Sequence, residues 1–225
     1  MIPYGKQHIT QEDIDEVIKV LKSEYLTSGP AVTKFEDIVK EFTGAKHAIA
    51  LTNATSGLHV ACLALGLKKG DIGVTVPISF LASSNCIIYC GADVEFVDID
   101  PETVCMSPKK LEEFIIKNGS PKVVIPVDFA GIPADLPKIW ELAKKYKFKV
   151  IEDASHSVGS TYTHEDKVYK CGDCKHADLA VFSFHPVKTV TAGEGGMVLT
   201  NDDELAKKVR MYANHGMERS LENFQ

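Results

Sequence analysis

A lysine stands between an apolar stretch and a glycine-rich turn in the last fifth of the chain. Lys188 follows the segment Leu179–Phe184 and precedes Gly193–Gly196. A lysine that attacks a carbonyl to form a Schiff base must be deprotonated, so its pKa has to fall from about 10.4 towards 7–8. Burial and nearby positive groups can supply the roughly 3–4 kcal/mol that this shift costs. The segment therefore predicts a Schiff-base lysine, with an ordinary surface-loop lysine as the alternative.

A second candidate is the acidic pair Glu152-Asp153, which ends the apolar stretch Val150–Ile151. Burying an unpaired carboxylate is very costly, so such a group needs a partner. A protonated pyridine nitrogen is one such partner, and holding that proton makes the ring an electron sink. The alternative for Asp153 is an N-cap of the following turn.

The third candidate is the small-residue turn Asn53–Gly57, which opens a predicted helix over Leu58–Leu65. Backbone N–H groups at a helix start, together with the helix dipole, attract phosphate. The dipole contributes only about 0.3–1 kcal/mol at an exposed site, so hydroxyl groups must do much of the binding. Thr55 and Ser56 are suited to that role, and a plain N-cap is the alternative.

Strand-length apolar runs alternate with amphipathic helical segments along the chain, which predicts an α/β fold with a mostly parallel sheet covered on both faces. In such sheets ligands bind outside the carboxyl ends of the strands. All three candidate segments follow predicted strands and should meet there. The predicted strands are His47–Leu51, Gly73–Pro77, Val94–Asp98, Lys122–Val127, Lys149–Glu152, Leu179–Phe184 and Gly196–Thr200.

Helical spacing recurs in four segments. A capping box at Thr10–Asp13 precedes an apolar face, and Gly29-Pro30 separates this helix from the next. Two further amphipathic helices are predicted over Ser107–Lys117 and Ala134–Tyr146. The first apolar face consists of Ile14, Val17, Ile18 and Leu21, and the second of Val32, Phe35, Ile38, Val39 and Phe42.

Composition narrows the class of protein. The 225 residues include 25 basic and 31 acidic side chains, for a net charge of −6, which argues against a nucleic-acid-binding surface. We expect no membrane-spanning helix and no signal peptide, because no long apolar run and no basic-then-apolar N-terminus are visible. A cytoplasmic location is the resulting expectation.

The cysteines predict no metal site. Four of the six lie among apolar neighbours, where a free cysteine behaves as a small buried residue. Cys171 and Cys174, with His176 nearby, could begin a zinc site, but structural zinc needs four ligands and no second pair follows. A turn between strands is the favoured interpretation.

The three candidate segments, taken in order with others, resemble the sugar aminotransferases of the DegT/DnrJ/EryC/StrS type. This family belongs to the fold-type I enzymes that use pyridoxal 5'-phosphate (PLP), and the resemblance covers essentially the whole chain. It implies the three-layer α/β/α large domain of a PLP-dependent transferase. The matching segments are 25–30, 53–56, 77–80, 96–101, 152–153 and 183–196.

The resemblance implies roles for individual residues around the cofactor. Lys188 would form the Schiff base and carry the proton between substrate and cofactor, and Asp153 would pair with the pyridine nitrogen. The ring of Phe80 would stack on the cofactor. His156 would lie beside the phenolic oxygen, where many relatives have glutamine. Related sugar dehydratases have histidine in place of the lysine, so Lys188 favours transamination.

The resemblance also implies that Thr55, Ser56 and Ser183 hold the cofactor phosphate. Within the family, four motifs are most similar to the branch that acts in pseudaminic acid biosynthesis. This similarity implies transfer of an amino group from glutamate, by way of the amino form of the cofactor (PMP), to the 4-keto group of a UDP-linked 6-deoxy-N-acetylhexosamine. The motifs are 77–80, 152–156, 183–188 and 215–217.

The resemblance further implies a homodimer with shared active sites. Residues 1–225 would comprise an N-terminal segment and the PLP-binding large domain, without the small C-terminal domain of the family. Three alternatives stay open: a sister aminotransferase acting on a C3 ketone or another nucleotide sugar, a PLP-dependent lyase or decarboxylase, and a truncated non-catalytic paralogue. The resemblance gives no role for Cys171 and Cys174.

Overall fold

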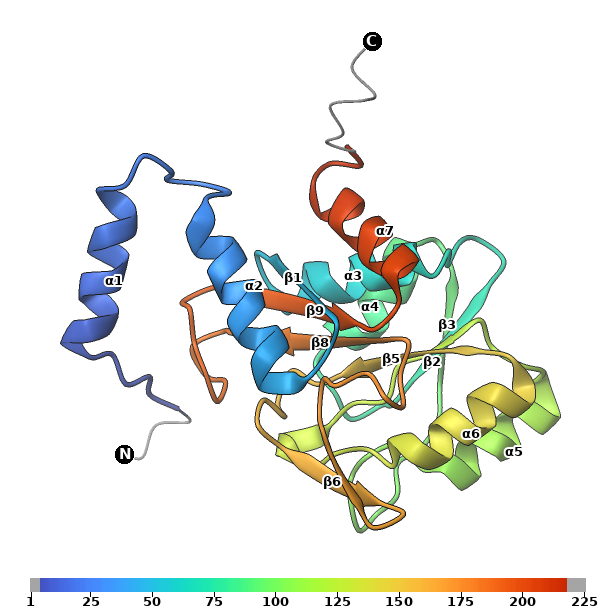
Figure 1. Ribbon diagram of the computed structural model, residues 1–225. Helices are drawn as coiled ribbons and strands as arrows, with labels where there is room; N and C mark the ends of the chain where they lie inside the picture. The colour runs from blue at the N-terminus through green and yellow to red at the C-terminus, as the bar shows by residue number, and fades with distance from the viewer. Residues whose placement is uncertain (1–4, 218–225) are drawn as a thin grey trace.

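A central sheet forms the core of the computed structural model, which describes residues 5–217 (Figure 1). Over these residues the sheet has seven strands in the order β1-β9-β8-β5-β4-β2-β3. The pairs from β8 to β3 are parallel, whereas β9 runs antiparallel to both β1 and β8. The strands are β1 His47–Leu51, β2 Ile72–Thr75, β3 Asp93–Phe96, β4 Val123–Val124, β5 Lys149–Asp153, β8 Leu179–Ser183 and β9 Gly196–Thr200.

Helices cover both faces of the sheet, which confirms the three-layer α/β/α arrangement (Figure 1). Successive side chains of a strand point to opposite faces, so Ile49 of β1 joins the core under the first group of helices and Ala48 the core under the second. The first group is α3 Ala54–Ala64, α4 Ala82–Tyr89 and α7 Asp203–Ala213, and the second is α2 Pro30–Thr43, α5 Pro108–Asn118 and α6 Leu136–Tyr146.

The N-terminal helix α1, Gln11–Leu21, stands apart from the rest of the molecule (Figure 1). Its predicted capping box is confirmed: the Thr10 hydroxyl accepts the Asp13 N–H at 3.3 Å, and the Thr10 N–H donates to Asp13 Oδ2 at 2.7 Å. None of its residues is buried, and its predicted apolar face is exposed. The helix and its apolar face are therefore as predicted, but no part of the described chain buries that face.

All seven predicted strands are present, although β4 is much shorter than the predicted Lys122–Val127. Pro126 has no N–H group and interrupts the hydrogen-bonded ladder after Ile125, whose N–H still donates to Val74 O at 2.8 Å. A single bridge, Val127 to Asp153, resumes the pairing. This bridge ties the end of β4 to the end of β5.

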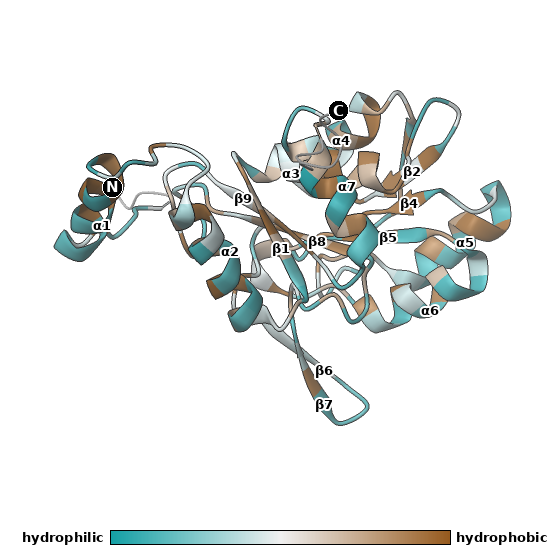
Figure 2. Ribbon diagram, turned by 45° about the horizontal axis from the view of Figure 1, so that its top comes forward, coloured by the Kyte–Doolittle hydropathy of each residue, from teal (hydrophilic) through white to brown (hydrophobic). Residues whose placement is uncertain are grey.

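A hairpin that the sequence did not predict extends from the core (Figure 2). Its strands are β6 Thr161–His164 and β7 Lys167–Lys170, which pair antiparallel. The two-residue turn between them, Glu165-Asp166, has φ values of 48° and 59°. A turn of that kind normally contains asparagine or glycine, so the usual sequence signal for a hairpin is missing.

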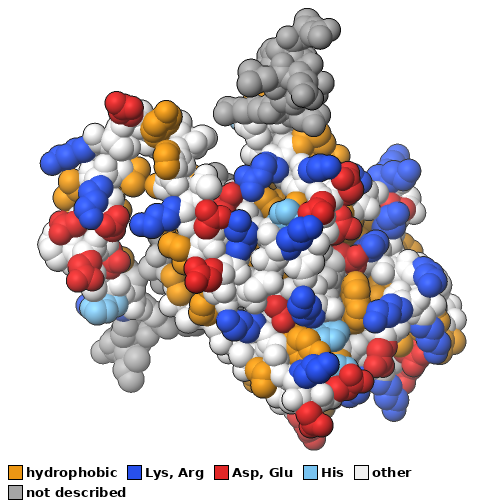
Figure 3. Space-filling view, viewed as in Figure 1, with side chains coloured by type: hydrophobic (Ala, Val, Ile, Leu, Met, Phe, Trp, Pro, Cys, Tyr) orange, Lys and Arg blue, Asp and Glu red, His pale blue; other side chains and the backbone are white. Residues whose placement is uncertain are grey.

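In the described range no helix is both long and apolar enough to cross a membrane. On the face shown in Figure 3, basic and acidic side chains are interspersed. The predicted domain runs over residues 1–225, and its first four and last eight residues lie outside the described part of the chain.

Candidate active site at the carboxyl edge of the sheet

The predicted site residues gather at one edge of the sheet. Because β1 and β8 are both antiparallel to β9, they point the same way, and β5 and β2 share that direction. Asp153 ends β5 and Ser183 ends β8, while the turn at Asn53 follows β1. The sheet therefore brings together segments that lie up to about 130 residues apart, at the edge where parallel sheets bind ligands.

Close backbone contact fixes the turn after β1 against β9. A Cβ atom built on Gly196 would lie 2.3 Å from the carbonyl carbon of Asn53 and 2.6 Å from the nitrogen of Ala54. Only glycine fits here, so the glycine-rich stretch brings β9 directly under the start of α3. Gly196 is the register partner of Ser183, so the hydroxyl-bearing end of β8 lies one strand away from that helix start.

This corner contains polar groups without partners. The hydroxyls of Thr55 and Ser183 form no hydrogen bond with any residue in the range 5–217. The first N–H groups of α3 likewise have no acceptor within the helix. Free N–H and hydroxyl donors around a helix start suit a phosphate group, so the local chemistry fits the predicted phosphate site.

Ser56 differs from this prediction in one respect. Asn53 caps α3, accepting the Ser56 N–H on Oδ1 at 2.8 Å, and the Ser56 hydroxyl donates to Asn53 O at 2.8 Å. Both Ser56 donors are therefore already engaged, and Ser56 could donate to a phosphate only by breaking the cap. The N-cap alternative is therefore present at Asn53, with Ser56 as its partner, whereas the Thr55 hydroxyl is free within residues 5–217.

Lys188 lies close enough to Asp153 and His156 for their charges to interact. Partial burial lowers the pKa of Lys188, and the negative charge of Asp153 opposes this shift. The pKa of His156 is also lowered, first by burial and then by the positive charge of Lys188. The site thus favours a neutral imidazole and a lysine that is easier to deprotonate than one in water.

A hydrogen bond fixes the proton position on His156. The backbone N–H of Ala130 donates to Nδ1 at 3.3 Å, so in the neutral ring the proton resides on Nε2. The ring also contacts Phe129 edge-on, with centroids 6.2 Å apart. His156 and Lys188 line the same cavity of about 280 Å³. A neutral His156 therefore presents one N–H donor, at Nε2.

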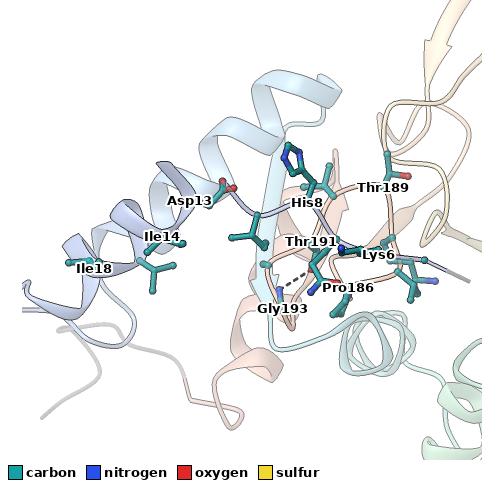
Figure 4. A pocket seen from close by; sticks show the side chains of 17 residues that line it. Lys6, His8, Asp13, Ile14, Ile18, Pro186, Thr189, Thr191 and Gly193 are labelled. Carbon is teal, nitrogen blue, oxygen red and sulfur yellow. Dashed lines mark hydrogen bonds between the residues drawn. The ribbon is translucent and has the colours of Figure 1, made fainter. Parts of the chain in front are cut away.

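A second, larger cavity of about 790 Å³ also reaches Lys188. Figure 4 shows Lys6 and His8, from the segment before α1, beside the loop that carries Thr189 and Thr191. The Thr191 hydroxyl accepts the Gly193 N–H at 3.0 Å and holds this loop in shape. The volume is within the usual range for small-molecule sites.

Phe80 lies on the loop between β2 and α4, at the same edge of the sheet. This residue is 69% exposed. Three residues further on, Ser83 is 1% exposed and its hydroxyl donates to Asp153 Oδ2 at 2.6 Å. Sequence reasoning missed Ser83, since nothing in one sequence pairs positions 70 residues apart.

The other acid of the pair, Glu152, faces a buried cluster below the site. Its carboxyl oxygens accept the Gly172 N–H, and Glu152, Asp128 and Cys171 bring ligand-type atoms within 4.8 Å of one another. Burial and the neighbouring charge of Asp128 raise the pKa of Glu152 well above its usual value. Both effects favour the protonated form of the Glu152 carboxyl.

Cys171 and Cys174 lie in the turn between β7 and β8, as the favoured interpretation predicted, and both thiols are buried. Burial raises the pKa of each thiol, which makes them unreactive. His176 is instead hydrogen-bonded through Nδ1 to the Tyr162 hydroxyl at 2.8 Å.

Sequence reasoning also missed Asp128, whose preceding strand carries no polar motif.

Comparisons with known proteins agree with this geometry. The profile of the DegT/DnrJ/EryC1/StrS aminotransferase family matches residues 7–225. A UDP-4-amino-4,6-dideoxy-N-acetyl-beta-L-altrosamine transaminase of Campylobacter jejuni is 44% identical over 218 residues, 96% of this chain and 56% of that protein. The spore coat polysaccharide biosynthesis protein SpsC of Bacillus subtilis is 39% identical over 99% of this chain and 55% of its own length.

Among solved structures, Helicobacter pylori PseC, an aminotransferase of pseudaminic acid biosynthesis, superposes with a TM-score of 0.88 at 33% identity. The match covers 97% of this chain and 57% of that protein. A putative sugar aminotransferase of Streptococcus pneumoniae in its PLP form gives a TM-score of 0.87 at 29% identity, over 98% of this chain and 59% of that one. The chain thus spans a little over half the length of these relatives.

Proposed function

We propose that this chain, which belongs to the DegT/DnrJ/EryC1/StrS aminotransferase family, supplies the Lys188 side of a PLP-dependent nucleotide-sugar aminotransferase. The whole enzyme would move an amino group from glutamate to the 4-keto group of a UDP-linked 6-deoxy-N-acetylhexosamine. The observation that carries this proposal is the meeting of Lys188, Asp153 and His156 beside unpartnered phosphate-binding groups at one edge of the sheet. The 44% identity to an altrosamine transaminase supports the substrate class.

The residues present fit the cofactor at both of its ends. Free donors at Thr55 and Ser183 would bind the phosphate, and the buried carboxylate of Asp153 would hold a proton on the pyridine nitrogen. The Nε2–H of His156 would donate to the phenolic oxygen, since Nδ1 is already an acceptor. When bound, PLP supplies an electron sink for the charge left on a substrate carbon after proton removal.

Lys188 performs the proton transfers in this proposal. Its lowered pKa increases the neutral fraction, and a neutral amine can both attack a carbonyl and accept a proton. The cavity of about 790 Å³ beside it would receive the sugar nucleotide. Walls formed by the segment before α1 would separate the reacting groups from bulk water.

We also propose that the enzyme works as a homodimer. Apolar side chains on α4 and on the loop before it, which also carries Phe80, are exposed in the described chain. A second copy of the chain would cover them and complete the cofactor's surroundings. They are Ile78, Leu81, Ile88 and Tyr89. Sedimentation should give twice the monomer mass, and a monomer at micromolar concentration would contradict this part of the proposal.

Covalent capture tests the cofactor site directly. After incubation with PLP the protein should absorb visible light, and borohydride should then fix the cofactor's mass to the peptide that contains Lys188. Lys188→Ala should bind PLP without covalent attachment. Lys208→Ala, which removes an exposed lysine on α7, serves as the matched control. Attachment at another lysine, or none in the wild-type enzyme, refutes the proposal.

Substrate assays test the reaction. The enzyme should form 2-oxoglutarate from glutamate only when a UDP-4-keto-6-deoxy-N-acetylhexosamine is present, together with the 4-amino sugar. A 3-keto analogue should give a much lower rate. If the 3-keto sugar is the better substrate, the sister activity is correct. A lyase or decarboxylase would instead release product without an amino acceptor.

A further inference from the structure

Two serines connect the loop that carries Phe80 to the carboxylate of Asp153. The Ser83 hydroxyl donates to Asp153 Oδ2 at 2.6 Å, and the hydroxyls of Ser79 and Ser83 are also 2.6 Å apart. Ser83 has a single hydroxyl proton, and it donates this proton in the hydrogen bond to Asp153. In the second contact, therefore, Ser79 is the donor and Ser83 Oγ the acceptor.

The direction of these bonds matters for the carboxylate. Asp153 is 3% exposed, and Oδ1 accepts the Ser155 N–H at 3.2 Å. Both oxygens therefore accept a hydrogen bond from the chain, and no cation in the described residues lies within ion-pair distance of Asp153. A hydrogen bond to a carboxylate fixes the orientation of its oxygens, and a second donor behind the first strengthens that bond in a low-dielectric site.

We propose that Ser83, supported by Ser79, is a positioning residue of the aminotransferase reaction: it orients the charged Asp153 carboxylate and sets the position of the Phe80 loop relative to it. The inference rests on the proposed function, in which Asp153 meets the edge of the cofactor ring and Phe80 its face. Ser79 is adjacent to Phe80, so the same pair of hydroxyls fixes both contacts. No other side chain within residues 5–217 donates to Asp153.

The neighbouring Ser84 provides a matched control on the same helix. It is also buried, but its hydroxyl donates to Leu81 O at 3.0 Å and does not contact Asp153. Removing either hydroxyl deletes one buried serine oxygen from the first turns of α4. Only Ser83→Ala removes a donor from the carboxylate, so a difference between the two variants isolates the effect on Asp153.

Kinetics of the whole enzyme form the first test. Ser83→Ala should lower kcat about tenfold with KM changed less than about twofold, since one hydrogen bond to a charged group is lost from the reacting complex. Ser83→Thr should restore kcat, because threonine retains the hydroxyl. Ser79→Ala should lower kcat by roughly threefold, and Ser84→Ala should leave it unchanged. Equal losses in Ser83→Ala and Ser84→Ala would overturn the proposal and indicate a packing role alone.

A second test needs neither cofactor nor activity. A short hydroxyl–carboxylate bond in a dry site should give a downfield, slowly exchanging hydroxyl proton in the NMR spectrum. This signal should vanish in Ser83→Ala, persist in Ser84→Ala, and move in Asp153→Asn. If it is absent from the wild-type chain, the proposed bond is wrong. If it is present but the enzyme has no transaminase activity, the proposed function fails while the link between Ser83 and Asp153 stands.

Discussion

Replacing Gly196 by alanine should distort the predicted phosphate site at the start of α3 more than any other single methyl group added to the sheet. The new Cβ would lie 2.3 Å from the Asn53 carbonyl carbon and 2.4 Å from its oxygen. Carbon atoms normally pack about 3.5–4.0 Å apart, so the turn would have to retreat by roughly 1 Å. Both clashing atoms belong to backbone and cannot rotate away.

The expected loss of stability is about 2–3 kcal/mol, near the upper end of overpacking effects. For a chain of this size that loss corresponds to a decrease in Tm of about 4–12 °C. Because the displaced turn carries Thr55 and the first N–H groups of α3, PMP should also bind at least about tenfold more weakly. Circular dichroism and fluorescence titration would measure the two effects.

Substitutions at two other glycines distinguish an effect on the predicted phosphate site from a general loss of stability. Gly73→Ala would press on the side chain of Ile87 at 2.7 Å, in the core and away from the corner. It should lower Tm but leave PMP binding intact in the protein that remains folded. Gly195→Ala meets Phe184 Cβ at 3.2 Å and should be nearly neutral. The reasoning is refuted if Gly196→Ala binds PMP like the wild type, or if Gly73→Ala weakens binding equally.

Two further predictions concern neighbours of the site. Asn53→Ala removes the cap of α3 and should cost about 1 kcal/mol, measured by urea unfolding, while Asn53→Asp should retain most of the stability; equal losses would mean that the cap bond contributes nothing. The pKa of Glu152 is raised in the folded state. Its contribution to the stability of the fold is therefore complete below its unfolded pKa of about 4.3 and is lost as pH rises through the folded pKa. Glu152→Gln, which retains an acceptor for Gly172, should therefore flatten the decline in stability as pH rises above about 4.3; an unchanged slope would assign that decline to other groups.

The fold could be predicted from sequence because its signals are local. Each strand is a short apolar run, and helix starts at Thr10 and Gly29-Pro30 follow standard capping patterns. The hairpin at Glu165-Asp166 was missed because its turn contains neither the asparagine nor the glycine that usually marks such a turn. The burial of Glu36 in α2 was also not predicted, since its partner Arg210, 3.0 Å away, lies 174 residues later.

The same limit applies to the site. Lys188, Asp153 and the Asn53 turn could be chosen as candidates because each follows a strand and parallel strands share one carboxyl edge. The contacts that tune them are long-range pairings. Ser83 meets Asp153 across the sheet, and Ala130 fixes the tautomer of His156 from another loop. No periodicity or spacing in one sequence encodes such contacts.

Glu152 and Asp153 show how one strand places adjacent acids in opposite environments. Because side chains alternate along β5, Asp153 faces the hydroxyl of Ser83 and the charge of Lys188, while Glu152 faces Asp128. Hydrogen-bond donors surround Asp153, whereas burial and a second acid raise the pKa of Glu152. A shift of one residue in the register of β5 would exchange these surroundings and place Glu152 in the site. The pairing of Val123 with Lys149 and of Ile151 with Leu179 is therefore what makes Asp153, and not Glu152, the acid available to a cofactor.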